Sequence, residues 1–125
     1  MIGYVTVGTN DLNRAAEFYD QLFAEMGGKR VMEADTFIAW GNSPTSPGLG
    51  ATKPFDGKPA TVGNGVMVAL QANNPAEVDR VYNKAIALGA KDEGPAGPRG
   101  DSGFYAGYFR DPDGNKLNVF CMNAK

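Results

Sequence analysis

The side chains that most often perform acid–base or metal chemistry are scarce in this sequence, which has 125 residues and no histidine. Histidine is the commonest metal ligand and the commonest general base, so any reaction must proceed without imidazole. Tyrosine remains available as a proton donor at neutral pH. Glu33, Asp35 and Asp101 are candidate carboxylates, but nothing in their spacing pairs them, so we interpret them as surface residues.

One arginine is a candidate for binding an acidic group. Arg99 lies in the segment 94–102, GPAGPRGDS, which its Gly and Pro content marks as a loop. A guanidinium can form paired hydrogen bonds with a carboxylate or phosphate. We therefore include Arg99 among the ligand-binding residues, and Lys53, at an expected strand end, is a weaker candidate of the same kind.

The composition argues against nucleic-acid and membrane partners. The net charge is −2, 42% of residues are hydrophobic and 21% are charged, without the clustered Lys and Arg that nucleic acids require. No signal peptide is visible, and no apolar segment approaches the roughly 20 residues of a membrane span. Cys121 is the only cysteine, so no internal disulfide can form. We expect a reducing, cytoplasmic setting.

The order of elements repeats along the chain and predicts two βαβββ modules. Apolar residues recur at helical spacing over 12–26 and 78–88, and a strand-like run precedes each helix at 2–8 and 66–72. Two similar units can bury their apolar faces against each other. We expect one domain over residues 1–125, with module one at about 1–54, module two at about 64–125 and a Pro- and Gly-rich linker between them. Three extended runs follow each helix, at 29–34, 36–41 and 49–53 and at 90–94, 103–110 and 116–122.

Aligning the two halves pairs individual residues. Tyr4 falls on Met67, and Trp40 falls on Tyr108. Because the repeat pairs Trp40 with Tyr108, we favour pocket positions for both over core positions. For Met67, a core and a pocket position are equally compatible with the pattern.

The sharpest local motif is the turn Asp111-Pro112-Asp113-Gly114-Asn115, between the runs GFYAGYFR and KLNVFCM. Together with the opening IGYVTVGTNDLNRAAEFYDQLF and the second-half opening VMVALQANNPAEVDRVYNKAIALGA, it resembles the vicinal oxygen chelate superfamily of glyoxalases, bleomycin-resistance proteins and extradiol dioxygenases. The resemblance spans nearly the whole chain. It implies an α+β fold in which the two modules form a curved, mostly antiparallel eight-stranded sheet with helices on the outside.

The resemblance also implies where a metal would bind. Metal-dependent members take one ligand from the first strand and one from the last strand of each module, and these positions correspond to Tyr4, Gly50, Met67 and Asn118. Glycine offers no side chain, and a phenol, a thioether and a neutral amide are weak ligands for a hard divalent cation. We therefore expect no metal and no cofactor, which puts the metal-assisted reactions of the family in doubt.

The expected groove is aromatic and sulfur-rich, and its predicted ligand-binding residues are Tyr4, Trp40, Met67, Arg99, Tyr108 and Asn118. Such a surface suits a small, flat or apolar ligand. Three functions stay open: a metal-free protein that binds an unknown small molecule, a metal-independent lyase or isomerase, and an interaction module without a small ligand. The resemblance further implies a homodimer.

Overall fold

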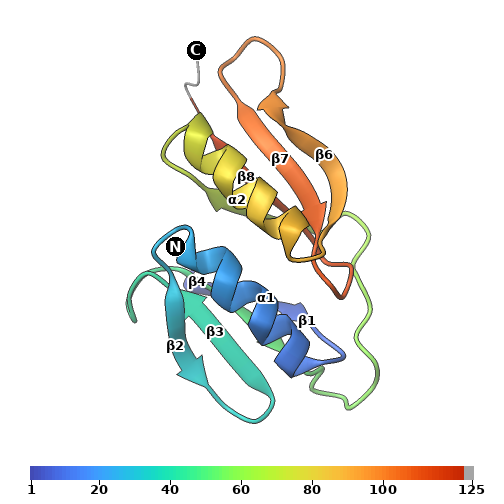
Figure 1. The fold of residues 1–125 in the computed structure, drawn as a ribbon. Helices are drawn as coiled ribbons and strands as arrows, with labels where there is room; N and C mark the ends of the chain where they lie inside the picture. Colours follow the sequence, from blue (N-terminus) through green and yellow to red (C-terminus); the bar gives the residue numbers. More distant parts are fainter. Residues whose placement is uncertain (123–125) are drawn as a thin grey trace.

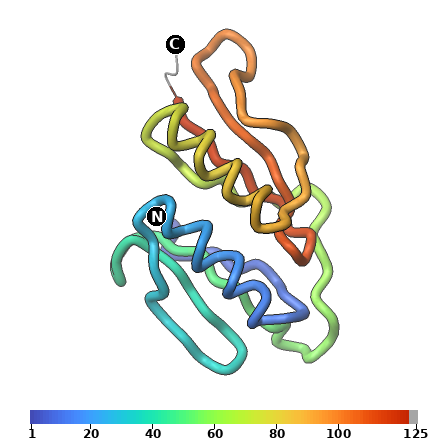
Figure 2. The backbone as a smooth tube through the Cα atoms, in the orientation of Figure 1, coloured from blue at the N-terminus to red at the C-terminus, as the bar shows by residue number. Residues whose placement is uncertain are grey.

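The computed structural model describes residues 1–122 and contains two helices and eight strands in the predicted order (Figure 1). The first module contains β1 (Tyr4–Gly8), α1 (Leu12–Ala24), β2 (Lys29–Glu33), β3 (Phe37–Gly41) and β4 (Gly48–Thr52). The second contains β5 (Val68–Gln71), α2 (Pro75–Ala87), β6 (Lys91–Pro98), β7 (Tyr105–Arg110) and β8 (Lys116–Cys121). The backbone follows the same path twice, as the trace in Figure 2 shows.

The strands form two four-stranded sheets with equivalent topologies, in the orders β1-β4-β3-β2 and β5-β8-β7-β6. In each sheet the first strand pairs in parallel with the last strand, and the remaining ladders are antiparallel. The predicted α+β fold with two βαβββ modules is therefore confirmed. The eight strands remain two separate sheets in this chain, because β1 and β5 are both edge strands and share no ladder.

The helix boundaries have local causes in the sequence. The side chain of Asp11 accepts a hydrogen bond from the Arg14 backbone N–H, and the side chain of Asn74 caps α2 in the same way. Pro75 occupies the first turn of α2, where its missing N–H is not needed. Gly89, with φ of 98°, follows the end of α2 in the left-handed conformation that glycine adopts without strain.

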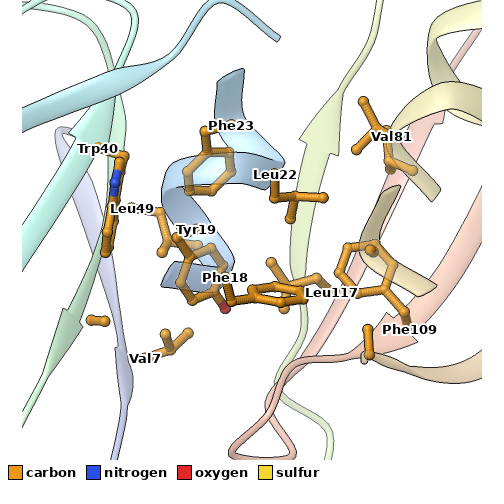
Figure 3. Close-up of a cluster of buried hydrophobic side chains, with 14 of the residues drawn as sticks. Val7, Phe18, Tyr19, Leu22, Phe23, Trp40, Leu49, Val81, Phe109 and Leu117 are labelled. Atoms are coloured by element: carbon orange, nitrogen blue, oxygen red, sulfur yellow. The ribbon is translucent and has the colours of Figure 1, made fainter. Parts of the chain in front are cut away.

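Aromatic side chains fill the core between α1 and its sheet (Figure 3). Tyr19 stacks on Phe23 with ring centroids 5.3 Å apart and packs against Trp40 at 5.4 Å. Phe18 reaches Phe109 of the second module at 6.5 Å. One continuous cluster of buried residues therefore includes both modules, and α1 and α2 lie side by side within it.

The predicted turn at residues 111–115 joins β7 to β8, and it also forms hydrogen bonds with the first module. The buried Asp111 carboxylate accepts backbone N–H bonds from Asp113 and Asn115 and a 2.6 Å hydrogen bond from the Tyr19 hydroxyl of α1. The Asn115 side chain donates to the Gly8 carbonyl of β1 at 2.8 Å. The turn therefore stabilises the packing of the modules as well as the hairpin.

The strand β6 is longer than the sequence predicts. It continues to Pro98, so the first half of the segment assigned to a loop is strand. Gly94 and Gly97 mark irregularities in the register with β7. An edge strand tolerates Gly, Pro and bulges because one side needs no hydrogen-bonding partner. Within residues 1–122, no helix is long and apolar enough to cross a membrane.

Candidate functional site

Each sheet has one face that packs on its helix and one that does not, and we call the second the helix-free face. On β8, Leu117, Val119 and Cys121 are buried in the core. Because side chains alternate along a strand, Lys116, Asn118 and Phe120 lie on the helix-free face of the second sheet. The candidate site is built on this face.

Tyr108 and Asn118 face each other at the centre of this surface. They are directly paired in the ladder between β7 and β8. The Arg99 guanidinium lies 5.5 Å from the centroid of the Tyr108 ring, and the Lys116 ammonium lies 5.7 Å from it. Both distances are within the range of cation–π attraction. The predicted residues Arg99, Tyr108 and Asn118 are thus brought together, with Lys116 as an additional member.

Asn118 has an unusual environment. Asn118 is 2% exposed, and its Oδ1 atom is buried without a hydrogen-bonding partner. Buried polar side chains almost always have a partner, and an unpaired one costs about 1–3 kcal/mol. Asn118 Oδ1 is therefore an acceptor without a partner among the described residues.

Arg99 is held in place by backbone carbonyls. Its guanidinium donates to Pro95 at 2.6 Å and to Gly97 at 2.9 Å. Its own backbone N–H donates to the Phe104 carbonyl at 2.8 Å, which closes the loop between β6 and β7. The position of the cation is therefore fixed by the chain itself.

Two phenylalanines extend the aromatic surface next to this centre. Phe104 stacks on Phe120 with centroids 5.7 Å apart and an interplanar angle of 26°. Neither Phe104 nor Lys116 was among the residues predicted to bind ligand. Lys116 was detectable from sequence, since it lies two residues before Asn118 on the same strand and therefore on the same face.

Tyr4 lies on the edge strand β1, and Met67 lies next to the equivalent edge strand β5. Tyr4 is 67% exposed and packs edge-on against Phe37 on the helix-free face of the first sheet, with centroids 6.4 Å apart. Met67 is 41% exposed and immediately precedes β5, whose Ala69 is paired with Asn118. Within one chain, Tyr4 therefore lies on a different sheet from Asn118, and only Met67 is close to it in the ladder.

The structure places Trp40 on the opposite side of its sheet from the helix-free face, where it lines the cleft between the modules. Its side chain is 1% exposed on the helix side of β3, and its indole Nε1–H donates to Asp20 of α1 at 2.8 Å. Arg30 and this indole hold the pKa of Asp20 below its ordinary value.

The pairing of Trp40 with Tyr108 in the aligned repeat is wrong by one residue. Leu49 pairs with Trp40 in the first sheet, and the equivalent Leu117 pairs with Phe109 in the second. The structural counterpart of Trp40 is therefore Phe109, and that of Tyr108 is Ala39. A shift of one residue along a strand moves a side chain to the opposite face of the sheet.

The four family positions do not form a divalent-cation site. A Cβ placed on Gly50 would clash with the Phe37 ring, so this ring fills the space in which a ligand side chain would extend. Tyr4 and Met67 supply a phenol and a thioether, which are poor ligands for hard cations. Among residues 1–122, no three His, Cys, Asp or Glu side chains are grouped as a metal site would require.

A cleft of about 760 Å³ lies elsewhere, between the edge strands β1 and β5. Its lining includes the predicted residues Trp40 and Met67, apolar residues such as Val5 and Leu70, and the polar Gln71. Neither Tyr108 nor Asn118 lines this cleft. Among the described residues, two buried side-chain oxygens have no hydrogen-bonding partner: Asn118 Oδ1 on the helix-free face and Asp113 Oδ2 in the turn at 111–115.

The comparisons with known proteins agree with the observed fold. The Glyoxalase/Bleomycin resistance protein/Dioxygenase superfamily matches residues 1–119. The chain belongs to this superfamily. A glyoxalase/bleomycin resistance protein from Albidiferax ferrireducens T118 is 35% identical, with a TM-score of 0.88 over 98% of both chains.

More distant structures share the fold. The lactoylglutathione lyase of Agrobacterium tumefaciens is 24% identical, with a TM-score of 0.70 over 97% of this chain and 92% of its own. A superfamily enzyme from Burkholderia phytofirmans PsJN is 18% identical, with a TM-score of 0.75 over 96% and 97%. A comparison with curated proteins gave no match.

Proposed function

We propose that this chain binds a small, flat, partly aromatic or apolar molecule on the helix-free face of its second sheet, without a metal. The observation that supports this most strongly is the unpaired Asn118 amide directly opposite Tyr108. Aromatic rings beside a few polar groups are the usual composition of small-molecule sites. The poor donor set at the family metal positions favours binding over metal-assisted chemistry.

We further propose that the protein acts as a homodimer. The edge strands β1 and β5 each present unpaired backbone groups, and the exposed Tyr4 and Met67 lie at these edges. Pairing β1 of one copy with β5 of another would cover both edges, which isolated proteins rarely leave open. It would also bring Tyr4 of one copy next to Asn118 of the other. Light scattering should then give about twice the 13.2 kDa chain mass.

A metal-independent lyase or isomerase is the second candidate, and a pure interaction module is the third. The lyase would need an acid–base group at the ligand. Tyr4, delivered by a second copy, is the group that could serve, as a proton donor. The interaction module would leave the aromatic surface without small ligands. Both alternatives are separate outcomes of the experiment below.

The test combines native mass spectrometry of the purified protein with thermal shift measurements against naphthalene-based probes. We expect a co-purified small molecule or a probe-dependent rise in Tm, because ligands that bind only the folded state stabilise it. Tyr108→Leu should remove the shift, and Tyr108→Phe should keep it. Turnover of a bound compound would favour the lyase. No shift with any aromatic probe and no co-purified compound would refute small-molecule binding.

A further inference from the structure

We infer that the ligand of this face is an aromatic anion, in which a carboxylate, sulfonate or phosphate is attached to the ring. This inference rests on the proposed function and adds the charge of the ligand. Lys116 and Arg99 would hold the anionic group, while the ring packs beside Tyr108. Asn118 would hydrogen-bond to the same end of the ligand.

Two basic side chains on the helix-free face have no acidic partner in the part of the chain that the structure describes. Arg110 is matched by Glu93, whose carboxylate accepts its Nε–H at 2.6 Å. Arg99 and Lys116 form no ion pair with any carboxylate of residues 1–122. Arg110 is the largest cause that lowers the pKa of Glu93, and Lys91 and Lys116 contribute to the same shift. Glu93 forms its ion pair with Arg110 alone, in a chain whose net charge is −2.

The charged groups of Arg99 and Lys116 lie close to the same aromatic ring. Both lie over one ring, at 5.5 and 5.7 Å from the centroid of Tyr108. A ligand ring in contact with Tyr108 would therefore place a substituent within reach of both charges. The carbonyls of Pro95 and Gly97 already fix the Arg99 guanidinium, and its Nε–H donates to no described acceptor. A guanidinium held in this way loses little side-chain entropy when an oxyanion binds.

The side chain of Asn118 lies beside this ring and can form a hydrogen bond to the same ligand. Asn118 pairs with Tyr108 across the ladder, and Lys116 lies two residues away on the same face. A side-chain amide can present its N–H to an anionic oxygen or its oxygen to a hydroxyl group. Neither cation can satisfy Asn118 Oδ1 where it stands, since that atom has no partner. An aromatic anion with a neighbouring hydroxyl group would use all three polar residues.

The test is isothermal titration calorimetry with three probes of one ring system: 2-naphthoate, 2-naphthol and 2-naphthylmethylammonium. We expect 2-naphthoate to bind about tenfold or more tightly than 2-naphthol, since one charge-assisted hydrogen bond contributes about that factor. The cation should bind most weakly. Raising the salt concentration should weaken 2-naphthoate and leave 2-naphthol unchanged.

Variants connect this preference to the named residues. Lys116→Gln and Arg99→Gln should each reduce the preference for 2-naphthoate about tenfold and leave the affinity for 2-naphthol within twofold. Lys58→Gln, the same charge change at an exposed linker residue, is the matched control and should change neither. Equal affinity for the acid and the alcohol, unaltered by Lys116→Gln, would overturn the anion inference and leave aromatic binding intact. No binding of any probe would overturn both proposals.

Discussion

Replacing Asn118 with leucine should stabilise the ligand-free protein. The two side chains have nearly the same branched shape, so Asn118→Leu removes the buried polar atoms without creating a large cavity. Asn118 Oδ1 has no partner in a residue that is 2% exposed. Relief of an unpaired buried amide and gain of apolar burial together amount to about 1–2 kcal/mol of unfolding free energy. For a domain of this size, that corresponds to roughly 5 °C in Tm.

The matched control is Asn115→Leu, three residues earlier in the chain. The Asn115 amide donates to the Gly8 carbonyl at 2.8 Å and to Asp111 Oδ2 at 3.0 Å, so its loss should cost about 2 kcal/mol. Urea unfolding of both variants and the wild type measures the two effects. The expected result is opposite signs for two identical substitutions. A lower stability for Asn118→Leu would mean that this amide is already satisfied, and its role as a group reserved for ligand would lose its support.

Three further predictions concern the structure around the site. Tyr19→Phe should lower the unfolding free energy by about 2 kcal/mol, because the buried Asp111 loses its 2.6 Å hydrogen bond from the other module; urea unfolding measures this loss, and an unchanged midpoint would contradict it. Burial raises the pKa of Tyr82 from 10.0 to about 12, so stability held by the neutral phenol should be lost as the pH rises from 10 through 12; absorbance titration against Tyr82→Phe tests this assignment. Gly50→Ala should destabilise the protein by about 1–2 kcal/mol, and by clearly less in a Phe37→Ala background, since the new Cβ would clash with that ring. A thermal-melt double-mutant cycle without coupling would show that the ring is not the obstacle.

The fold could be predicted from the sequence because its signals are local and repeated. Helical periodicity, the caps and the turn residues occur in the same order in both halves. The face of Trp40 could not be predicted in this way. The sequence aligns the two halves correctly at β1 and β5 and at the equivalent Leu49 and Leu117. Between them, the alignment of β3 with β7 was shifted by one residue, which assigned Trp40 to the surface of the sheet and not to the core.

Contacts between residues far apart in the sequence could not be predicted from local patterns. The motif at 111–115 reads as a turn from its own residues, but its contact with Tyr19 joins positions 92 apart in sequence. The position of Arg99 likewise depends on carbonyls that converge only when β6 continues to Pro98. Lys116 is different, since strand alternation alone places it beside Asn118.

The equivalence of Gly50 and Asn118 shows how the helix-free faces of the two modules differ in chemistry. Both residues lie at the same register position of the last strand, paired with Thr6 in the first sheet and with Ala69 in the second. In the first module, the Phe37 ring covers the glycine, which leaves an apolar surface beside Tyr4. In the second, an unpaired amide stands next to two cations and an aromatic ring. An apolar face is suited to contact with protein, and a polar, cationic face is suited to a small ligand. Duplication of one module has therefore produced two surfaces of different chemistry, and the second is the one on which substitutions should change ligand binding.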